Sequence, residues 1–297
     1  AAILVMAIVA PGLSDGWSHG GYSADESTPD FGTHDWIADM AARAVGTNAS
    51  ILYQEYRSEF LLGTEAPDNP SYIGDYVNHH VYYYSSGSLQ DDAAADRAAE
   101  MFVESSGHLS AGRYGEAAFS AGAMVHYISD MGVFGHTMGS ETDWGSEDHH
   151  SDYEDQVEFL IDGLGERDFP GLQRASAYDA ALALARTVTF GEGETEPNVW
   201  MDDNYDWDDP VFEASAVSSL YASVESSASA LMTLLDGLPE EPADEPADEP
   251  ADEPADEPAK DEPEDDGGWG DRMLYLIGAA AAAAVAVILL LARRMSR

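Results

Sequence analysis

The sequence predicts an all-α domain, and two observations carry this prediction. The longer segments repeat apolar residues at the three- and four-residue spacing of amphipathic helices. Runs that alternate β-branched and polar residues, the pattern of a half-buried strand, are scarce. We therefore expect one multi-helix domain over residues 17–238, followed by a disordered stalk and one transmembrane helix. The expected helices span residues 35–45, 49–61, 92–105, 115–131, 151–164, 177–188 and 211–235.

The composition is strongly acidic and lacks cysteine. There are 57 acidic and 12 basic residues, a formal net charge of -45, and Lys260 is the one lysine. Such a charge repels nucleic-acid phosphates, so no nucleic-acid partner is expected. Near-absence of lysine favours a halophilic protein, because molar salt screens this self-repulsion; the alternative is an ordinary acidic extracellular protein. Without cysteine, a metal must be held by His, Asp, Glu or backbone groups.

The first residues have the character of a secretion signal. Residues 1–13 are apolar but too few to span a bilayer as a helix. Small residues, Ser14 and Gly16, occupy the third and first positions before Trp17. We expect residues 1–16 to be a truncated signal peptide that is cleaved before Trp17. The alternative is a buried N-terminal strand.

The last sixty residues predict a stalk and an anchor. Within residues 239–268 the sequence Glu-Pro-Ala-Asp repeats four times, and its prolines and like charges predict an extended, disordered linker. Residues 273–292 are twenty apolar residues, enough for a transmembrane helix. Arg293, Arg294 and Arg297 follow, so the positive-inside rule places residues 293–297 in the cytoplasm and the domain outside the cell membrane. A buried core helix is the alternative for residues 273–292.

Histidines and carboxylates recur at helical spacing. His126 and Asp130, like His150 and Glu154, are four residues apart and would share a helix face. One such pair is typical of a surface hydrogen bond, but the pairs together predict a metal cluster with nitrogen and oxygen ligands. Its further members are His34, Asp68, His80 and His136. We assign His19, His79, His108 and His149 to ordinary surface roles, although either member of the two His-His dipeptides could be the ligand.

These residues, taken in order with Trp17, resemble the ligand string of the zinc-dependent phospholipases C, a bacterial family that includes the clostridial alpha-toxin. Three local sequences carry the resemblance: GTHDWI around His34, HYISD from His126, and HSDYEDQVE from His150. The intervals also match, with 12 residues from Asp68 to His80, 10 from His126 to His136 and 14 from His136 to His150. The resemblance covers the whole of residues 17–238.

The resemblance implies an all-α fold that holds up to three Zn²⁺ ions and hydrolyses a phospholipid, releasing a diacylglycerol-like lipid and a phosphorylated headgroup. It implies that Asp68 also orients or deprotonates the attacking water, and we expect a monomer. The implied ligands are Asp68, His80, His126 and Asp130 for one ion; His136, His150 and Glu154 for a second; and His34, Asp130 as a bridge and the backbone amine and carbonyl of Trp17 for a third.

Two other functions remain open from the sequence. The related zinc-dependent single-strand nucleases share a similar string, but they place the first His nearer the Trp than the 17 residues between Trp17 and His34, and they end in Asp rather than a residue such as Glu154. The second alternative is a surface-anchored protein whose metals serve binding or structure alone. A catalytic zinc keeps an open coordination position, whereas a structural zinc is closed by four protein ligands.

Overall fold

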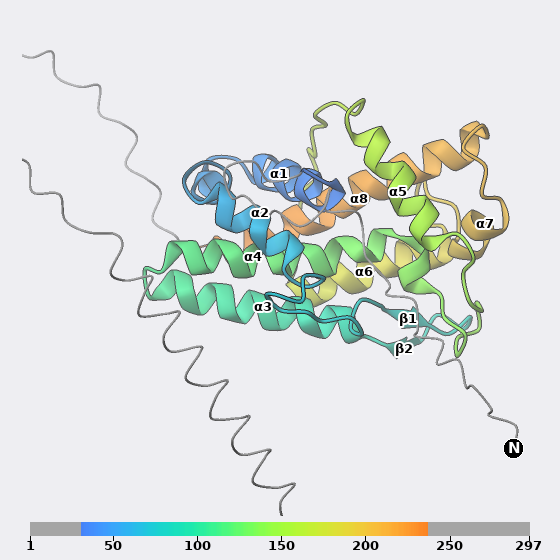
Figure 1. The fold of residues 1–297 in the computed structure, drawn as a ribbon, viewed down its shortest axis with the longest axis horizontal. Coiled ribbons are helices and arrows are strands. Elements are labelled where there is room, and N and C mark those ends of the chain that lie inside the picture. Colours follow the sequence, from blue (N-terminus) through green and yellow to red (C-terminus); the bar gives the residue numbers. More distant parts are fainter. Residues whose placement is uncertain (1–30, 237–297) are drawn as a thin grey trace, which may run out of the picture. The chain divides into compact units, whose positions relative to one another are not determined.

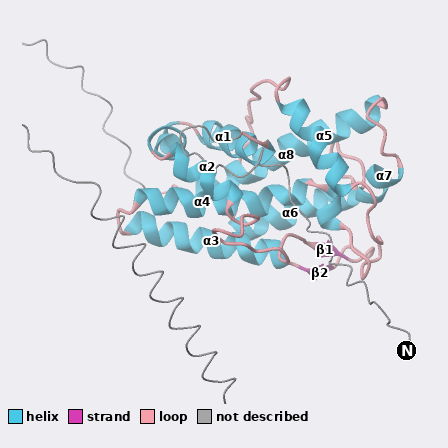
Figure 2. Cartoon of the chain, viewed as in Figure 1, coloured by secondary structure: helices cyan, strands magenta, loops and turns pink. Residues whose placement is uncertain are grey.

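The computed structural model describes residues 31–236, and within them the predicted all-α fold is confirmed (Figures 1 and 2). Among these residues, no helix is both long and apolar enough to cross a membrane. The predicted signal peptide, stalk, transmembrane helix and cytoplasmic tail lie outside the described residues, as does Trp17. The α-helices are α1 Thr33–Val45, α2 Arg57–Glu65, α3 Ala93–Ser110, α4 Tyr114–Ser129, α5 His150–Ile161, α6 Ala177–Phe190, α7 Asn198–Asp203 and α8 Pro210–Leu234.

Short elements join these helices. Two helical turns, η1 (Thr47–Ala49) and η2 (Ile51–Glu55), lie between α1 and α2, and two more, η3 (Asp130–Gly132) and η4 (Phe134–Thr137), follow α4 directly. Strands β1 (Tyr82–Tyr83) and β2 (Leu89–Asp91) pair antiparallel, with Tyr82 opposite Asp91 and Tyr83 opposite Leu89.

The predicted single helix over residues 49–61 is wrong. The chain forms the π-helical turn η2, leaves helical geometry at Tyr56 (φ -119°, ψ 37°) and starts again as α2 at Arg57. Apolar spacing continues across this break, which is why the sequence pattern hides it. Because α2 then runs to Glu65, its end lies three residues before Asp68. The hairpin and α7 were not predicted, since strands of two and three residues and a six-residue helix show too little periodicity.

Helix α4 lies at the centre of the fold and packs against α2, α3, α1 and α8. Its buried residues run round the helix and are mostly small, which lets neighbouring helices approach closely. The closest approach is at Gly63 of α2 and Gly122 of α4. A Cβ at Gly63 would lie 2.1 Å from the Phe119 carbonyl oxygen, and one at Gly122 would lie 2.0 Å from that of Phe60. Only glycine fits at this crossing.

The same packing brings the C-terminal end of α4 to the N-terminal start of α1. Asp35 is buried in the first turn of α1, accepts a hydrogen bond from the Gly32 backbone N–H, and receives one from the Thr64 hydroxyl of α2. A carboxylate near a helix N-terminus is favoured by the helix dipole. This contact fixes the start of α1, which carries the candidate ligand His34, against the last turn of α2.

Candidate metal centre

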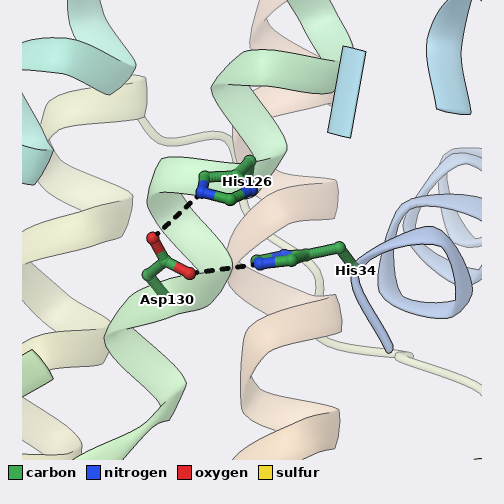
Figure 3. Close-up of side chains that lie close together, drawn as sticks. All are labelled: His34, His126 and Asp130. Carbon is green, nitrogen blue, oxygen red and sulfur yellow. Dashed lines mark ion pairs between the residues drawn. The ribbon is translucent and has the colours of Figure 1, made fainter. Parts of the chain in front are cut away.

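The core of the site is formed by one carboxylate between two imidazoles from different helices. His34 is on α1, His126 is in the last turn of α4, and Asp130 begins η3 one turn later (Figure 3). His34 Nε2 is 3.2 Å from Asp130 Oδ1, and His126 Nε2 is 3.3 Å from Asp130 Oδ2. The two rings stack with centroids 4.1 Å apart. All three side chains are fully buried.

Asp68 and His79 extend the site on the Oδ2 side of Asp130. His79 Nδ1 is 2.8 Å from Asp130 Oδ2 and 3.2 Å from His126 Nε2. Asp68 Oδ2 is 3.7 Å from the same His126 nitrogen. The other ring nitrogen of His79, Nε2, donates to the backbone carbonyl of Asp75, which leaves Nδ1 to face the cluster. Asp68, His79 and His126 thus form a second group able to hold a metal ion.

A third group combines η4 with the start of α5. His136 Nε2 is 3.6 Å from Glu154 Oε1 and 3.9 Å from Asp130 Oδ1. His150 Nε2 is 2.8 Å from the same Glu154 oxygen, and the His136 and His150 rings meet edge to face at 4.5 Å. The predicted four-residue pair on α5 is therefore confirmed as a local geometry. Asp130 reaches toward this group as well as the other two.

Hydrogen bonds behind the rings orient their metal-facing nitrogens. His126 Nδ1 donates to the Thr64 carbonyl at 2.7 Å, and His34 Nδ1 donates to the Ser129 hydroxyl oxygen at 2.9 Å. Ser129 in turn donates to the backbone carbonyl of His126. These bonds place a proton on Nδ1 of both rings, so Nε2 is the nitrogen of each ring that faces Asp130. Metal-binding histidines are commonly held in this way.

The donor set fits zinc. Two ligands at 2.0–2.3 Å from a tetrahedral zinc are roughly 3.3–3.7 Å apart, close to the distances between these nitrogens and oxygens. Each of the three groups keeps its ligand atoms within 4.8 Å of one another. Among the described residues, His34 Nε2, Asp130 Oδ1 and His136 Nε2 are buried without a hydrogen bond. Buried polar atoms normally have partners, so atoms of this kind aimed into one cluster favour a bound cation.

Burial and charge set the protonation of the site. Burial, followed by the nearby His126, lowers the pKa of His34 to about 4, and burial also holds the pKa of His136 well below its ordinary value. Burial disfavours ionisation of Asp130, but His126 and His136 outweigh it and keep its pKa well below normal. At neutral pH His34 and His136 are therefore neutral imidazoles and Asp130 is an ionised carboxylate, which are the forms that bind a metal.

In the His150–Glu154 pair, by contrast, the pKa values of both groups are raised. Burial raises the pKa of Glu154 to about 7, against the pull of His150. Burial lowers the pKa of His150, yet the carboxylates of Glu154 and Glu147 overcome it and raise the value to about 10. In the metal-free protein this pair therefore keeps a proton near neutral pH. A bound metal would have to displace it, which couples binding to proton release.

The prediction of His80 in the cluster is corrected by the structure, which places His79 there. His80 lies at the side of the cluster, where Nε2 is 3.3 Å from Asp91 Oδ1 and the ring stacks on Tyr82. From residue 79 to 83 the chain is extended and alternate residues are buried, so Val81 and His79 face the same side. Because Val81 is apolar and would be buried, the alternation of an extended segment could have predicted that His79, and not His80, faces the interior.

The structure brings the remaining predicted residues within the described chain together. His34, Asp68, His126, Asp130, His136, His150 and Glu154 all face the three groups, and their role as metal ligands stays a prediction. His149 points away from the cluster and pairs with Asp202, as expected for the second His-His dipeptide. Asp75 was missed by sequence reasoning. Its carbonyl fixes His79, and its carboxylate accepts bonds from Tyr127 and pairs with Arg97.

Comparisons with known proteins find relatives of the fold and of the sequence. The fold resembles the alpha-toxin of Clostridium absonum, with a TM-score of 0.52, 17% identity, and coverage of 68% of this chain and 63% of the toxin. It also resembles the Clostridium perfringens alpha-toxin from an avian strain, with a TM-score of 0.52, 16% identity, and coverage of 74% and 65%. The chain thus spans less than two thirds of either toxin.

No functionally curated protein matches the sequence. The sequence model described as "Zinc dependent phospholipase C" matches residues 33–192, more than half of the 297-residue chain. That match contains every residue of the three groups. The chain belongs to the zinc-dependent phospholipase C family.

Proposed function

We propose that the protein is a zinc-dependent phospholipase C, which cleaves a phospholipid into a diacylglycerol-like lipid and a phosphorylated headgroup. The observation that supports it most is the convergence on Asp130. One oxygen of its carboxylate faces His34 and His136, and the other faces His79 and His126. A carboxylate with imidazoles on both sides is suited to bridge two cations, and clustered cations suit an anionic substrate.

The zinc ions, when bound, would neutralise the charge of the phosphodiester, lower the pKa of water and stabilise the attacking and leaving oxygens. The protein's own residues then determine position and proton transfer. The buried Asp68, beside His79 and His126, is proposed to orient the attacking water and accept its proton. His34 and His126 are held by Ser129 and Thr64 and need no rearrangement before turnover.

The proposal includes a place of action. The apolar residues 273–292 and the arginines after them would anchor the protein in the cell membrane, with the catalytic domain outside. The acidic, proline-rich residues 239–268 would act as a spacer between the two. Tethering would keep the site at a high effective concentration near its lipid substrate. Protease treatment of intact cells should release the domain into the medium; retention inside the cell would contradict this placement.

The experiment that tests the function compares substrates and one variant. Zinc-loaded protein should release a phosphorylated headgroup from phospholipid vesicles and leave single-stranded DNA intact. Asp68→Asn should keep most of the zinc but lower kcat by about 10²–10⁴, the usual contribution of a general base. Asp96→Asn, at an exposed position of α3, is the matched control and should retain full activity.

Three outcomes would contradict the proposal. Faster cleavage of single-stranded DNA than of phospholipid would indicate the nuclease function. A protein that binds its full complement of zinc but hydrolyses neither substrate would be a metal-binding surface protein. Full activity in Asp68→Asn would remove Asp68 from the proposed proton transfer while leaving the family assignment intact.

A further inference from the structure

The short helix α7 contacts two segments that carry candidate ligands: η4, with His136, and the start of α5, with His150. In the sequence these segments are separated by the loop of residues 138–149. Asn198 and Asp202 are four residues apart on α7, so they project from one face of the helix. Both side chains are buried, with Asn198 fully so and Asp202 only 7% exposed. Polar side chains buried at this spacing need partners, and each finds them beside a different candidate ligand.

Asn198 contacts the segment that carries His136. Its side-chain Nδ2 donates to the Thr137 carbonyl at 3.2 Å and to the Thr137 hydroxyl oxygen at 3.1 Å. The same hydroxyl donates to the carbonyl of Phe134, which closes the η4 turn. Thr137 directly follows His136, so Asn198 fixes the backbone that presents this imidazole.

Asp202 contacts the segment that carries His150 and Glu154. Its carboxylate accepts the backbone N–H groups of Asp148 at 3.0 Å and His149 at 3.1 Å, and it pairs with His149 Nδ1 at 3.0 Å. The residue before α5, His149, provides no side-chain cap for the helix. Asp202 therefore supplies, from another helix, the acceptor and negative charge that a helix start requires.

The segment η4 and the start of α5 are packed so closely that a small shift of either one would displace the His150 side chain. A Cβ built at Gly135 of η4 would lie 2.5 Å from His150 Cγ, so the imidazole of His150 rests directly on the η4 backbone. The loop that joins η4 to α5, residues 138–149, is not helical and contains one isolated backbone bridge, Gly139 to Gly145. Helix α7 contacts both ends of this loop and so provides a second connection between η4 and α5.

We propose that Asn198 and Asp202 are positioning residues, and that α7 clamps η4 to the start of α5 so that His136, His150 and Glu154 meet around one zinc ion. This inference rests on the zinc-dependent function proposed above, but it is tested on metal affinity and not on turnover. Partners behind metal ligands commonly change affinity by 10–100-fold. The effect should be confined to one ion, because His34, Asp68, His79 and His126 are held by other elements.

The test is a competition titration of the full chain with zinc and a chromophoric chelator. Asp202→Ala and Asn198→Ala should each weaken one zinc affinity by about 10–100-fold and leave the others unchanged. Asp202→Asn keeps an acceptor oxygen and should lose less. Asp203→Ala is the matched control, since this neighbouring aspartate of α7 is exposed and should have no effect.

A double variant, in which Asp202→Ala is combined with His150→Ala, identifies which zinc ion is affected. His150→Ala removes a ligand of the third group, so adding Asp202→Ala to it should change the remaining affinities no further. Unchanged affinities in Asp202→Ala, or an equal loss at every site, would overturn the inference. If Asp202→Ala fails to fold, Asn198→Ala and Asp202→Asn decide by the same criterion. A protein that binds zinc as described but cleaves no phospholipid would contradict the proposed function and leave this inference standing.

Discussion

His126 shows how much of the site depends on single atoms. Its Nδ1 is occupied by the Thr64 carbonyl, and its Nε2 lies near oxygens of both Asp130 and Asp68. The four-residue spacing from His126 to Asp130 was enough to predict that they share a helix face, because α4 and η3 continue the same coil. The contact with Thr64 was not predictable, since it joins residues 62 positions apart through a carbonyl that carries no sequence signal.

The choice between His79 and His80 gives a direct test at the residue scale. His79→Ala should remove one zinc ion and lower kcat/KM by at least about 100-fold, since loss of a ligand exceeds the effect of its outer partners. His80→Ala should leave the zinc content unchanged, because its ring faces Asp91 and Tyr82. Metal analysis of the two purified variants is the measurement. Loss of zinc from His80→Ala alone would restore the original sequence prediction.

At the scale of elements, the sequence predicted the long helices well and the short connections poorly. Helices α1, α4, α6 and α8 each begin and end within a few residues of the predicted bounds, because their apolar faces repeat over three or more turns. The break at Tyr56 and the helix α7 carry no such repeat. Both matter for the site. The break at Tyr56 sets where α2 begins, and α7 contacts Thr137, next to His136, and the start of α5.

The crossing of α2 and α4 supports a prediction about stability. In Gly63→Ala the new methyl group would collide with the Phe119 carbonyl, so the helices must separate, at a cost of about 1–3 kcal/mol. The melting temperature should fall by roughly 2–12 °C for a domain of this size. Gly107→Ala on α3 is the control: a Cβ there meets nothing within 4 Å, and alanine should stabilise the helix by about 0.5–1 kcal/mol. Equal melting temperatures for both variants would show that the crossing can relax.

At the scale of the whole molecule, the charge of -45 is the dominant feature. Within residues 31–236, several ion pairs, such as Arg174 with Asp236 and Arg186 with Glu192, are exposed at the surface. Exposed pairs contribute little to stability and are screened by salt. The halophilic character predicted from composition therefore stays a prediction about long-range repulsion between surface carboxylates.

Salt should stabilise the protein. The Debye length shrinks from about 10 Å at 0.1 M to about 3 Å at 1 M, which removes most repulsion between surface carboxylates. A gain of only 2 kcal/mol would raise the melting temperature by about 4–8 °C. Thermal unfolding of the zinc-loaded protein in 0.1 M and 2 M KCl is the measurement, with an uncharged solute at matched osmolality as the control. A melting temperature that falls with salt would contradict the prediction.

The order of the ligands along the chain has a consequence for biogenesis. His34 arrives near the start of the domain, whereas its stacking partner His126 and the pair His150 and Glu154 come about a hundred residues later. The three groups can assemble only after the chain has been synthesised through Glu154, so metal uptake would follow the synthesis of α1 to the start of α5. A truncated or mistranslated product would leave charged groups without a counterion in its interior and would be unstable. Such a product would be removed by chaperones and proteases and would not persist as a partly active protein.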